Sequence, residues 1–98
     1  MGYPDALNNL AAMYLNGYVP GFRDPDKEGA KLYLEGAKKG SMFCMFGYAR
    51  CLETGTGIKK NELDAGSWYE KAATEGFEPA IDWCRAHPGL APGFSPRS

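Results

Sequence analysis

The sequence has few of the residues on which enzyme active sites depend. It contains a single histidine, His87, which comes directly before Pro88 at the expected end of a helix. A hydrolase needs a nucleophile held beside a base, and an isolated histidine at a helix end is usually a solvated or capping residue. We therefore expect no catalytic residues, no cofactor and no enzymatic activity.

An excess of charge of one sign and long apolar runs are also missing. The 11 basic and 12 acidic residues are well mixed, so the chain lacks the positive surface that nucleic acid or an acidic membrane attracts. No run of about 18 apolar residues is present, and the N-terminus lacks the pattern of a signal peptide. We expect a cytoplasmic protein that binds neither nucleic acid nor membrane, with a periplasmic or secreted mature form as the alternative.

The three cysteines have no spacing that suits a metal site. Cys44 and Cys51 fall on one expected helix, about 10.5 Å apart along its axis, which is too far for a shared metal ion or a disulfide. Cys84 belongs to a later helix and could approach either of them. Because no secretion signal is visible, we predict three free, mostly buried thiols and no metal ligands.

The clearest structural signal lies in residues 61–76. Apolar residues recur there at the i, i+3, i+4 and i+7 spacing of an amphipathic helix. Asn61 can cap the start, and Gly76 can end the helix in a left-handed conformation. The pattern predicts a helix over 62–75 whose buried residues are Ala65, Trp68, Tyr69, Ala72 and Ala73.

This stretch has a copy 36 residues earlier in the chain. The copy predicts a helix over 25–39, ended by Gly40 in the place of Gly76. Its buried residues should be Gly29, Leu32, Tyr33, Gly36 and Ala37. A glycine inside a helix costs about 1 kcal/mol relative to alanine, unless a close helix approach requires it.

A second pattern repeats with a shift of 38 residues. It predicts a first helix that ends near Asn16, a third over 42–54, and a fifth cut short at His87. The apolar stripe of the first helix is Leu7, Leu10, Ala11 and Tyr14. Two helices in a period of 36 to 38 residues are typical of an α-solenoid, so we expect an all-α fold.

We expect the chain, residues 1–98, to form one domain that is built of internal repeats. Repeat one covers 2–39, repeat two covers 40–75, and a partial third repeat covers 76–87. The tail, 88–98, is rich in proline and glycine and should be extended or disordered unless Leu90 and Phe94 dock on the helices.

These residues resemble the Sel1-like repeat family, which is related to the tetratricopeptide repeats. The resemblance rests on ALNNLAAMYLNG at 6–17, on GTGIKKNELDAGSWYEKAATEG at 55–76, and on the paired glycines at 40 and 76. It implies a solenoid of two Sel1-like helix-turn-helix repeats plus a terminal capping helix. It also implies a non-catalytic adaptor, often bacterial, that holds a protein or peptide in a groove lined by the first helix of each repeat.

The sequence departs from the family pattern at four positions. Ala11 and Ala49 stand where glycine is usual, and Gly29 and Gly36 stand where alanine is usual.

The groove should be lined by residues that lie between the core positions of the first helices. The predicted partner-binding residues are Asn8, Ala12, Leu15, Asn16, Phe43, Phe46, Arg50, Glu53 and Asp82. Two phenylalanines beside an arginine are typical of an interface hot spot. The alternative is that Phe43 and Phe46 are ordinary solenoid core.

Three functional classes are left open by the sequence. The favoured class is a binding module, either an adaptor or an inhibitor-like protein that occludes its partner. The alternative is a structural fragment of a longer solenoid, or a homo-oligomer that self-associates through exposed repeat ends, because two and a half repeats are marginal for independent stability. An enzyme is the third class.

Overall fold

Five helices follow one another along the part of the chain that the computed structural model describes, residues 3–18, 20–21 and 23–93. They are α1 (Tyr3–Leu15), α2 (Pro25–Lys38), α3 (Met42–Thr54), α4 (Glu62–Thr74) and α5 (Glu78–Ala86). The all-α class is confirmed, and the helices predicted over 42–54 and 62–75 are present with ends that agree to within about a residue.

The local sequence sets the helix ends as predicted. The Asn61 side chain accepts a hydrogen bond from the Asp64 backbone N–H at 3.1 Å and so caps the start of α4. Ser41 does the same for α3, accepting from the Cys44 N–H at 3.3 Å. Gly76, with φ of 95°, ends the α4 turn in the left-handed region that favours glycine.

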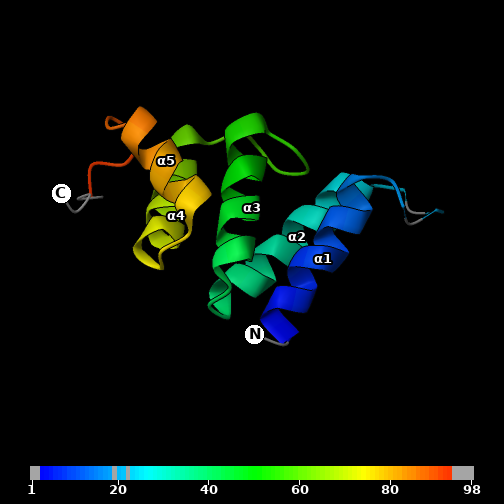
Figure 1. The fold of residues 1–98 in the computed structure, drawn as a ribbon. Helices are drawn as coiled ribbons and strands as arrows, with labels where there is room; N and C mark the ends of the chain where they lie inside the picture. Colours follow the sequence, from blue (N-terminus) through cyan, green and yellow to red (C-terminus); the bar gives the residue numbers. More distant parts are fainter. Residues whose placement is uncertain (1–2, 19, 22, 94–98) are drawn as a thin grey trace.

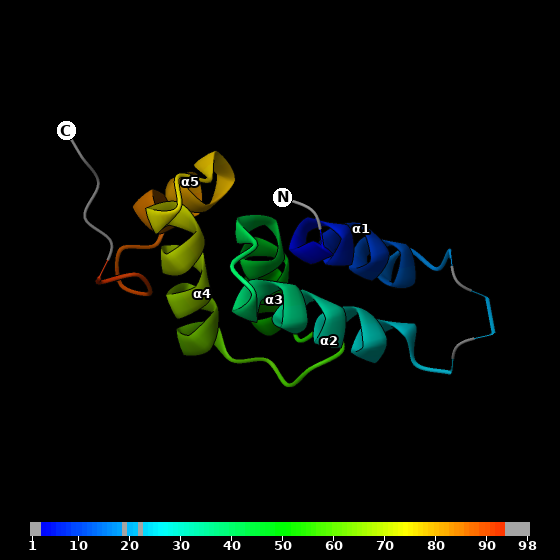
Figure 2. The same ribbon diagram turned by 90° about the horizontal axis from the view of Figure 1, so that it is seen from below.

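The helices form two hairpins and a fifth helix placed in series (Figures 1 and 2). α1 packs on α2, α3 on α4, and α5 on α4, while α3 joins the hairpins by packing against α2 and α1. The structure is elongated, with extents of 47, 29 and 18 Å. Each hairpin therefore buries its apolar side against its neighbours, as in a solenoid.

The core combines alanines with aromatic rings. In α4 the predicted residues Ala65, Tyr69, Ala72 and Ala73 are all buried, and Trp68 is half-buried. The small residues let helices approach closely, and the rings fill the remaining space.

Two glycines of α2 lie where neighbouring helices approach closely. A Cβ at Gly36 would overlap the Cys44 Sγ on α3 and lie 3.1 Å from the Pro4 carbonyl oxygen on α1. A Cβ at Gly29 would come within 2.8 Å of the Leu15 Cγ. Close helix approach therefore accounts for both glycines and offsets their predicted cost.

Leu10 is the core prediction that the structure contradicts. Leu10 is 40% exposed and Met13 is 44% exposed, whereas their repeat equivalents, Tyr48 and Cys51, are 8% and 3% exposed. α3 is packed between α2 and α4, but the described residues place no helix on the corresponding side of α1. We refer to Ala6, Leu10 and Met13, all exposed, as the open face of α1.

The beginning of the tail docks on α4. Ala91 is buried, and the Gly93 N–H donates a hydrogen bond to Glu70 Oε2 at 2.8 Å. The Leu90 carbonyl packs directly on Gly66, where a side chain would overlap it. Phe94, also predicted as a docking residue, lies outside the described residues.

None of the helices in the described part of the chain combines the length and apolar character that a membrane span requires.

Candidate functional site

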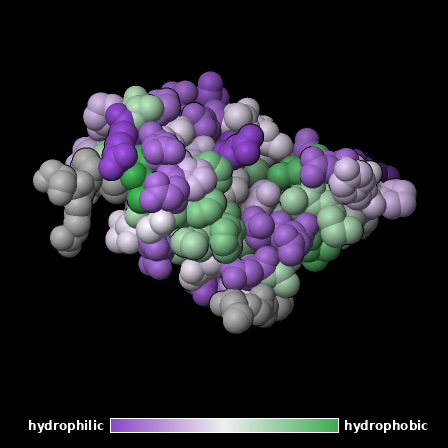
Figure 3. Space-filling model, in the orientation of Figure 1, coloured by the Kyte–Doolittle hydropathy of each residue, from purple (hydrophilic) through white to green (hydrophobic). Residues whose placement is uncertain are grey.

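A cleft of about 580 Å³ lies between α1 and α3. α1 and α3 supply most of its lining, and Tyr33 of α2 and one residue from each of three connecting segments complete it. Among the described residues, the lining is Asn8, Ala12, Leu15, Asn16, Tyr33, Phe43, Phe46, Gly47, Arg50, Cys51, Thr54, Thr56 and Phe77. In the space-filling view, green apolar surface over α3 lies beside purple polar surface over α1 (Figure 3).

The apolar part of the lining is an aromatic cluster. Phe43 and Phe46 both pack edge-to-face on Phe77, with ring centroids 5.2 Å apart in each case. Phe46 also packs on Tyr69 at 5.3 Å. Phe43 is 38% exposed and Phe46 is half-buried, so the two rings line the cleft while they also join α3 to α4 and the start of α5.

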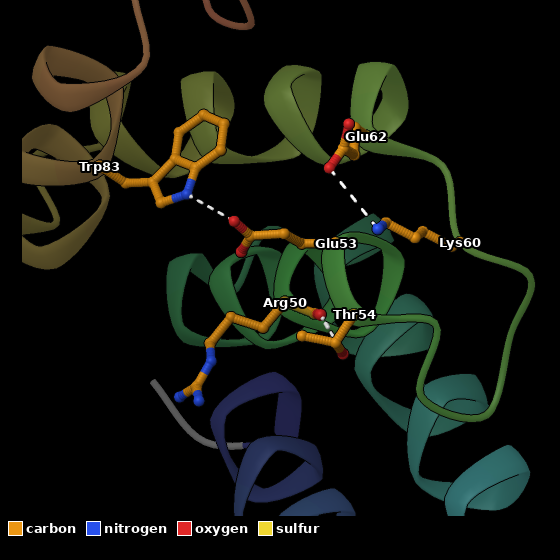
Figure 4. Close-up of polar contacts among 6 residues, drawn as sticks. All are labelled: Arg50, Glu53, Thr54, Lys60, Glu62 and Trp83. Carbon is orange, nitrogen blue, oxygen red and sulfur yellow. Dashed lines mark hydrogen bonds and ion pairs between the residues drawn. The ribbon is translucent and has the colours of Figure 1, made fainter.

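Arg50 is the charged residue of the lining. The Glu53 carboxylate, one turn further along α3, accepts hydrogen bonds from the Tyr69 hydroxyl at 2.7 Å and from Trp83 Nε1 at 3.2 Å. Figure 4 shows Glu53 turned toward Trp83, while the Arg50 side chain extends toward α1. Within the described residues, the exposed Arg50 guanidinium has no hydrogen bond or ion pair; only its backbone carbonyl is engaged, by Thr54.

The polar wall of the cleft carries two asparagines, Asn8 within α1 and Asn16 directly after its last residue. Asn8 is half-buried and Asn16 is exposed, and neither side chain has a hydrogen-bond partner in the described part of the chain. Opposite them, the hydroxyls of Thr54 and Thr56 lie 2.7 Å apart. The cleft thus offers free amide groups beside an apolar surface.

The cleft brings together all but two of the predicted groove residues. Glu53 does not line it, because hydrogen bonds from Tyr69 and Trp83 hold its carboxylate toward α4 and α5. Asp82 is exposed on α5 and also lies outside the lining, so these two predicted groove residues do not border this cleft.

Sequence reasoning missed several lining residues, each for a physical reason. Tyr33 was predicted as core, and it reaches the cleft because Gly47 has no side chain to block its ring. Phe77 lies in the turn before α5, where helical spacing cannot predict the direction of a side chain. Cys51 was predicted as a buried thiol. It is buried, and it also forms part of the cleft wall.

The titratable groups of the lining other than Arg50 are neutral near pH 7. Burial raises the pKa of the Cys51 thiol from its ordinary 9.0 to about 11. Burial also raises the pKa of Tyr33 above its ordinary value of 10.0. Arg50 is therefore the one charge among the described lining residues.

The three cysteines and the histidine do not form a catalytic or metal-binding cluster within the described residues. Cys44, Cys51 and Cys84 are all free and buried, as predicted. The His87 ring stacks on Trp83 at 4.2 Å, and its Nδ1 lies 2.9 Å from the Trp83 carbonyl oxygen. A search of the described residues finds no group of three His, Cys, Asp or Glu side chains placed to hold a metal ion.

A comparison with protein families finds a match to the Sel1 repeat. The family model matches residues 4–41 and 43–77, which together take in α1 to α4. The two matched segments confirm that the chain holds two Sel1-like repeats.

Two curated fungal proteins are similar in sequence. The chain is 33% identical over 84 residues to chitin synthase regulator SKT5 of Saccharomyces cerevisiae, a match that covers 86% of this chain and 12% of the relative. It is 37% identical over 70 residues to chitin synthase regulatory factor 3 of Schizosaccharomyces pombe, covering 71% of this chain and 7% of that protein. The chain thus spans a small part of the relatives it matches.

Two solved bacterial structures share the fold. A Sel1 repeat protein from Oxalobacter formigenes superposes with a TM-score of 0.77 at 30% identity, over 87% of this chain and 62% of the other. A protective antigen present in uropathogenic Escherichia coli strains, described as displaying an SLR fold, gives a TM-score of 0.77 at 29% identity, over 92% of this chain and 19% of the other.

Proposed function

The chain belongs to the Sel1 repeat family, and from that premise we propose that it is a non-catalytic binding module that holds a partner protein or peptide in the cleft between α1 and α3. The observation that carries the proposal is the composition of the cleft: its lining includes exposed aromatic surface at Phe43 and the guanidinium of Arg50, which has no partner within the described residues. Aromatic and arginine side chains dominate the binding energy of protein interfaces. The names of the fungal relatives, which describe regulators, favour a binding role over catalysis.

The proposal covers an adaptor and an inhibitor-like protein equally, since both act by binding a partner protein. It includes no nucleic-acid or membrane partner, because the charge is balanced. It also includes a cytoplasmic location, for which the free, buried cysteines are the support, since reducing compartments preserve thiols.

The test is peptide selection followed by measured affinities. A random peptide library displayed on phage is selected against the wild-type chain, and the dissociation constant of the best peptide is measured by fluorescence anisotropy. Phe43→Ala should weaken binding by about tenfold, because it removes exposed aromatic surface from the cleft. We prefer Phe43 to Phe46, whose additional packing on Tyr69 makes it a structural residue as well.

Leu63 supplies the matched control. It is 72% exposed on α4 and does not line the cleft, so Leu63→Ala also removes exposed apolar surface, but elsewhere. The proposal predicts unchanged affinity for this variant. Equal losses for Phe43→Ala and Leu63→Ala would place the peptide outside the cleft.

A second candidate function is stacking through the open face of α1. The exposed Leu10 and Met13 correspond to residues that α3 buries, so this face is suited to another helix, either from a further repeat or from a second copy of the chain. Sedimentation velocity tests self-association. If the face pairs two copies, the wild-type chain is dimeric at micromolar concentration and Met13→Glu is monomeric; a wild-type monomer at all concentrations argues against self-association.

A further inference from the structure

We propose that the cleft recognises a carboxylate of its partner through Arg50, and that an apolar side chain two residues away in the same peptide packs on Phe46 and Phe43. This inference rests on the proposed function and names the chemistry of the ligand.

The first argument is that the carboxylate next to Arg50 along α3 is already engaged. Glu53 lies one helical turn from Arg50, at the usual spacing of an ion pair on a helix. Its two oxygens instead accept hydrogen bonds from Tyr69 and Trp83, on the side of α3 away from the cleft. Arg50 is left, within the described residues, with a guanidinium that has five N–H donors and no acceptor for them.

The second argument is charge complementarity. Arg50 is the one charge among the described residues of the lining, so a carboxylate placed there meets no like charge from the walls of the cleft. A guanidinium pairs with a carboxylate through two parallel hydrogen bonds, which makes the contact both strong and directional. The adjoining phenylalanines exclude part of the water, and less water strengthens the attraction.

The third argument concerns spacing. Phe46 and Arg50 are one turn apart on α3, about 6 Å along its axis. An extended peptide advances about 3.3 Å per residue, and alternate side chains point to the same side. A peptide that runs along α3 would therefore place an apolar side chain and an acidic side chain, or a C-terminal carboxylate, two positions apart.

The opposite wall suits the backbone of such a peptide. The amides of Asn8 and Asn16 each offer donors and an acceptor, and neither has a partner in the described residues. An extended peptide presents N–H and C=O groups to either side, so α1 can bind its backbone while α3 binds its side chains.

The experiment uses the full chain and a random twelve-residue library displayed on phage. Peptides selected by the wild-type chain should share an acidic residue two positions from an apolar one. For the best peptide, replacing the acidic residue by its amide should weaken binding about tenfold, as expected for a hydrogen bond to a charged group. A free and an amidated C-terminus are compared to distinguish a terminal carboxylate from a side-chain carboxylate.

Arg50→Gln provides the decisive arm. It should weaken binding of the acidic peptide about tenfold and leave the amide peptide unaffected, because the two changes remove the same contact. Arg85→Gln, the same substitution on exposed surface of α5 outside the cleft, should change neither. Thermal melts check that both variants fold. Arg50→Lys should recover part of the affinity, because lysine restores the positive charge but cannot form two parallel hydrogen bonds with the carboxylate.

The outcomes separate this inference from the proposed function. Selection of peptides with no shared acidic position, or equal loss of both peptides in Arg50→Gln, overturns carboxylate recognition and leaves the binding module standing. Failure to enrich any peptide overturns both.

Discussion

Adding one methyl group to α2, by Gly36→Ala, tests how closely the helices of the first repeat pack. In an open helix this change stabilises by about 1 kcal/mol, because alanine has less backbone entropy to lose. Here the added Cβ would overlap the Cys44 Sγ, lie 2.9 Å from the Cys44 Cβ and lie 3.1 Å from the Pro4 carbonyl oxygen. Cys44 is completely buried, so it has little room to move.

The magnitude follows from two opposing terms. Overfilling a packed core costs about 1–3 kcal/mol, and the upper half of that range applies because neighbours on both α3 and α1 must shift. After subtracting the helix-propensity gain, we expect Gly36→Ala to destabilise the chain by about 1–2 kcal/mol. In a domain of this size each kcal/mol lowers the melting temperature by roughly 4–8 °C.

The assay is reversible urea and thermal unfolding followed by far-UV circular dichroism. Gly29→Ala is the matched comparison on the same helix. Its added Cβ would also lie 3.1 Å from a backbone carbonyl oxygen, that of Ala11, but its closest neighbour is the Leu15 side chain at 2.8 Å, which can rotate toward the cleft. We expect Gly29→Ala to stay within about 1 kcal/mol of the wild-type stability. In a Cys44→Ala background, Gly36→Ala should cost less, because the overlapping sulfur is gone.

A melting temperature of Gly36→Ala equal to or above that of the wild type would refute the reasoning. It would mean that α2 and α3 can move apart without loss of stability, and that helix propensity alone determines the effect of a substitution at residue 36.

Three further predictions concern polar and thiol groups of the core. Glu53→Gln should destabilise the chain by about 1.5–3 kcal/mol, because an amide has one acceptor oxygen for the two donors of Tyr69 and Trp83; an unchanged urea midpoint would contradict this. The raised pKa of Cys51 means that stability is full below the ordinary thiol pKa of 9.0 and falls as pH rises toward about 11, which urea titrations across that range measure. Thiol counting without reductant should find three free thiols after unfolding. In the native chain the thiols should react slowly at pH 8, whereas a rapid reaction would show that they are accessible.

The sequence predicted the helices and most of the core because both depend on local spacing. The stripe in α4 and the cap at Asn61 follow from the chemistry of neighbouring residues. The glycines of α2 illustrate the limit of that reasoning. Propensity marked Gly29 and Gly36 as weak points, but the atoms that require them belong to α1 and α3, and only the packed structure brings those atoms close.

The site was predicted less completely, for a related reason. Helical spacing gives the direction in which a side chain leaves its helix, and Phe43 and Arg50, which it predicted to face a groove, both line the cleft. It does not reveal which partner draws a long side chain to one side. Glu53 left the predicted groove because of donors on α4 and α5, and Phe77 joined the lining from a turn.

The open face of α1 and the docked tail make the two ends of the described structure unequal. At one end Leu10 and Met13 are exposed, and at the other Leu90 and Ala91 cover α4. Stacking of another copy on the part of α4 that Leu90 and Ala91 cover would require displacement of the tail. If two copies pair through the open face of α1, the contact is isologous: one face meets its own copy across a twofold axis, and growth stops at the pair.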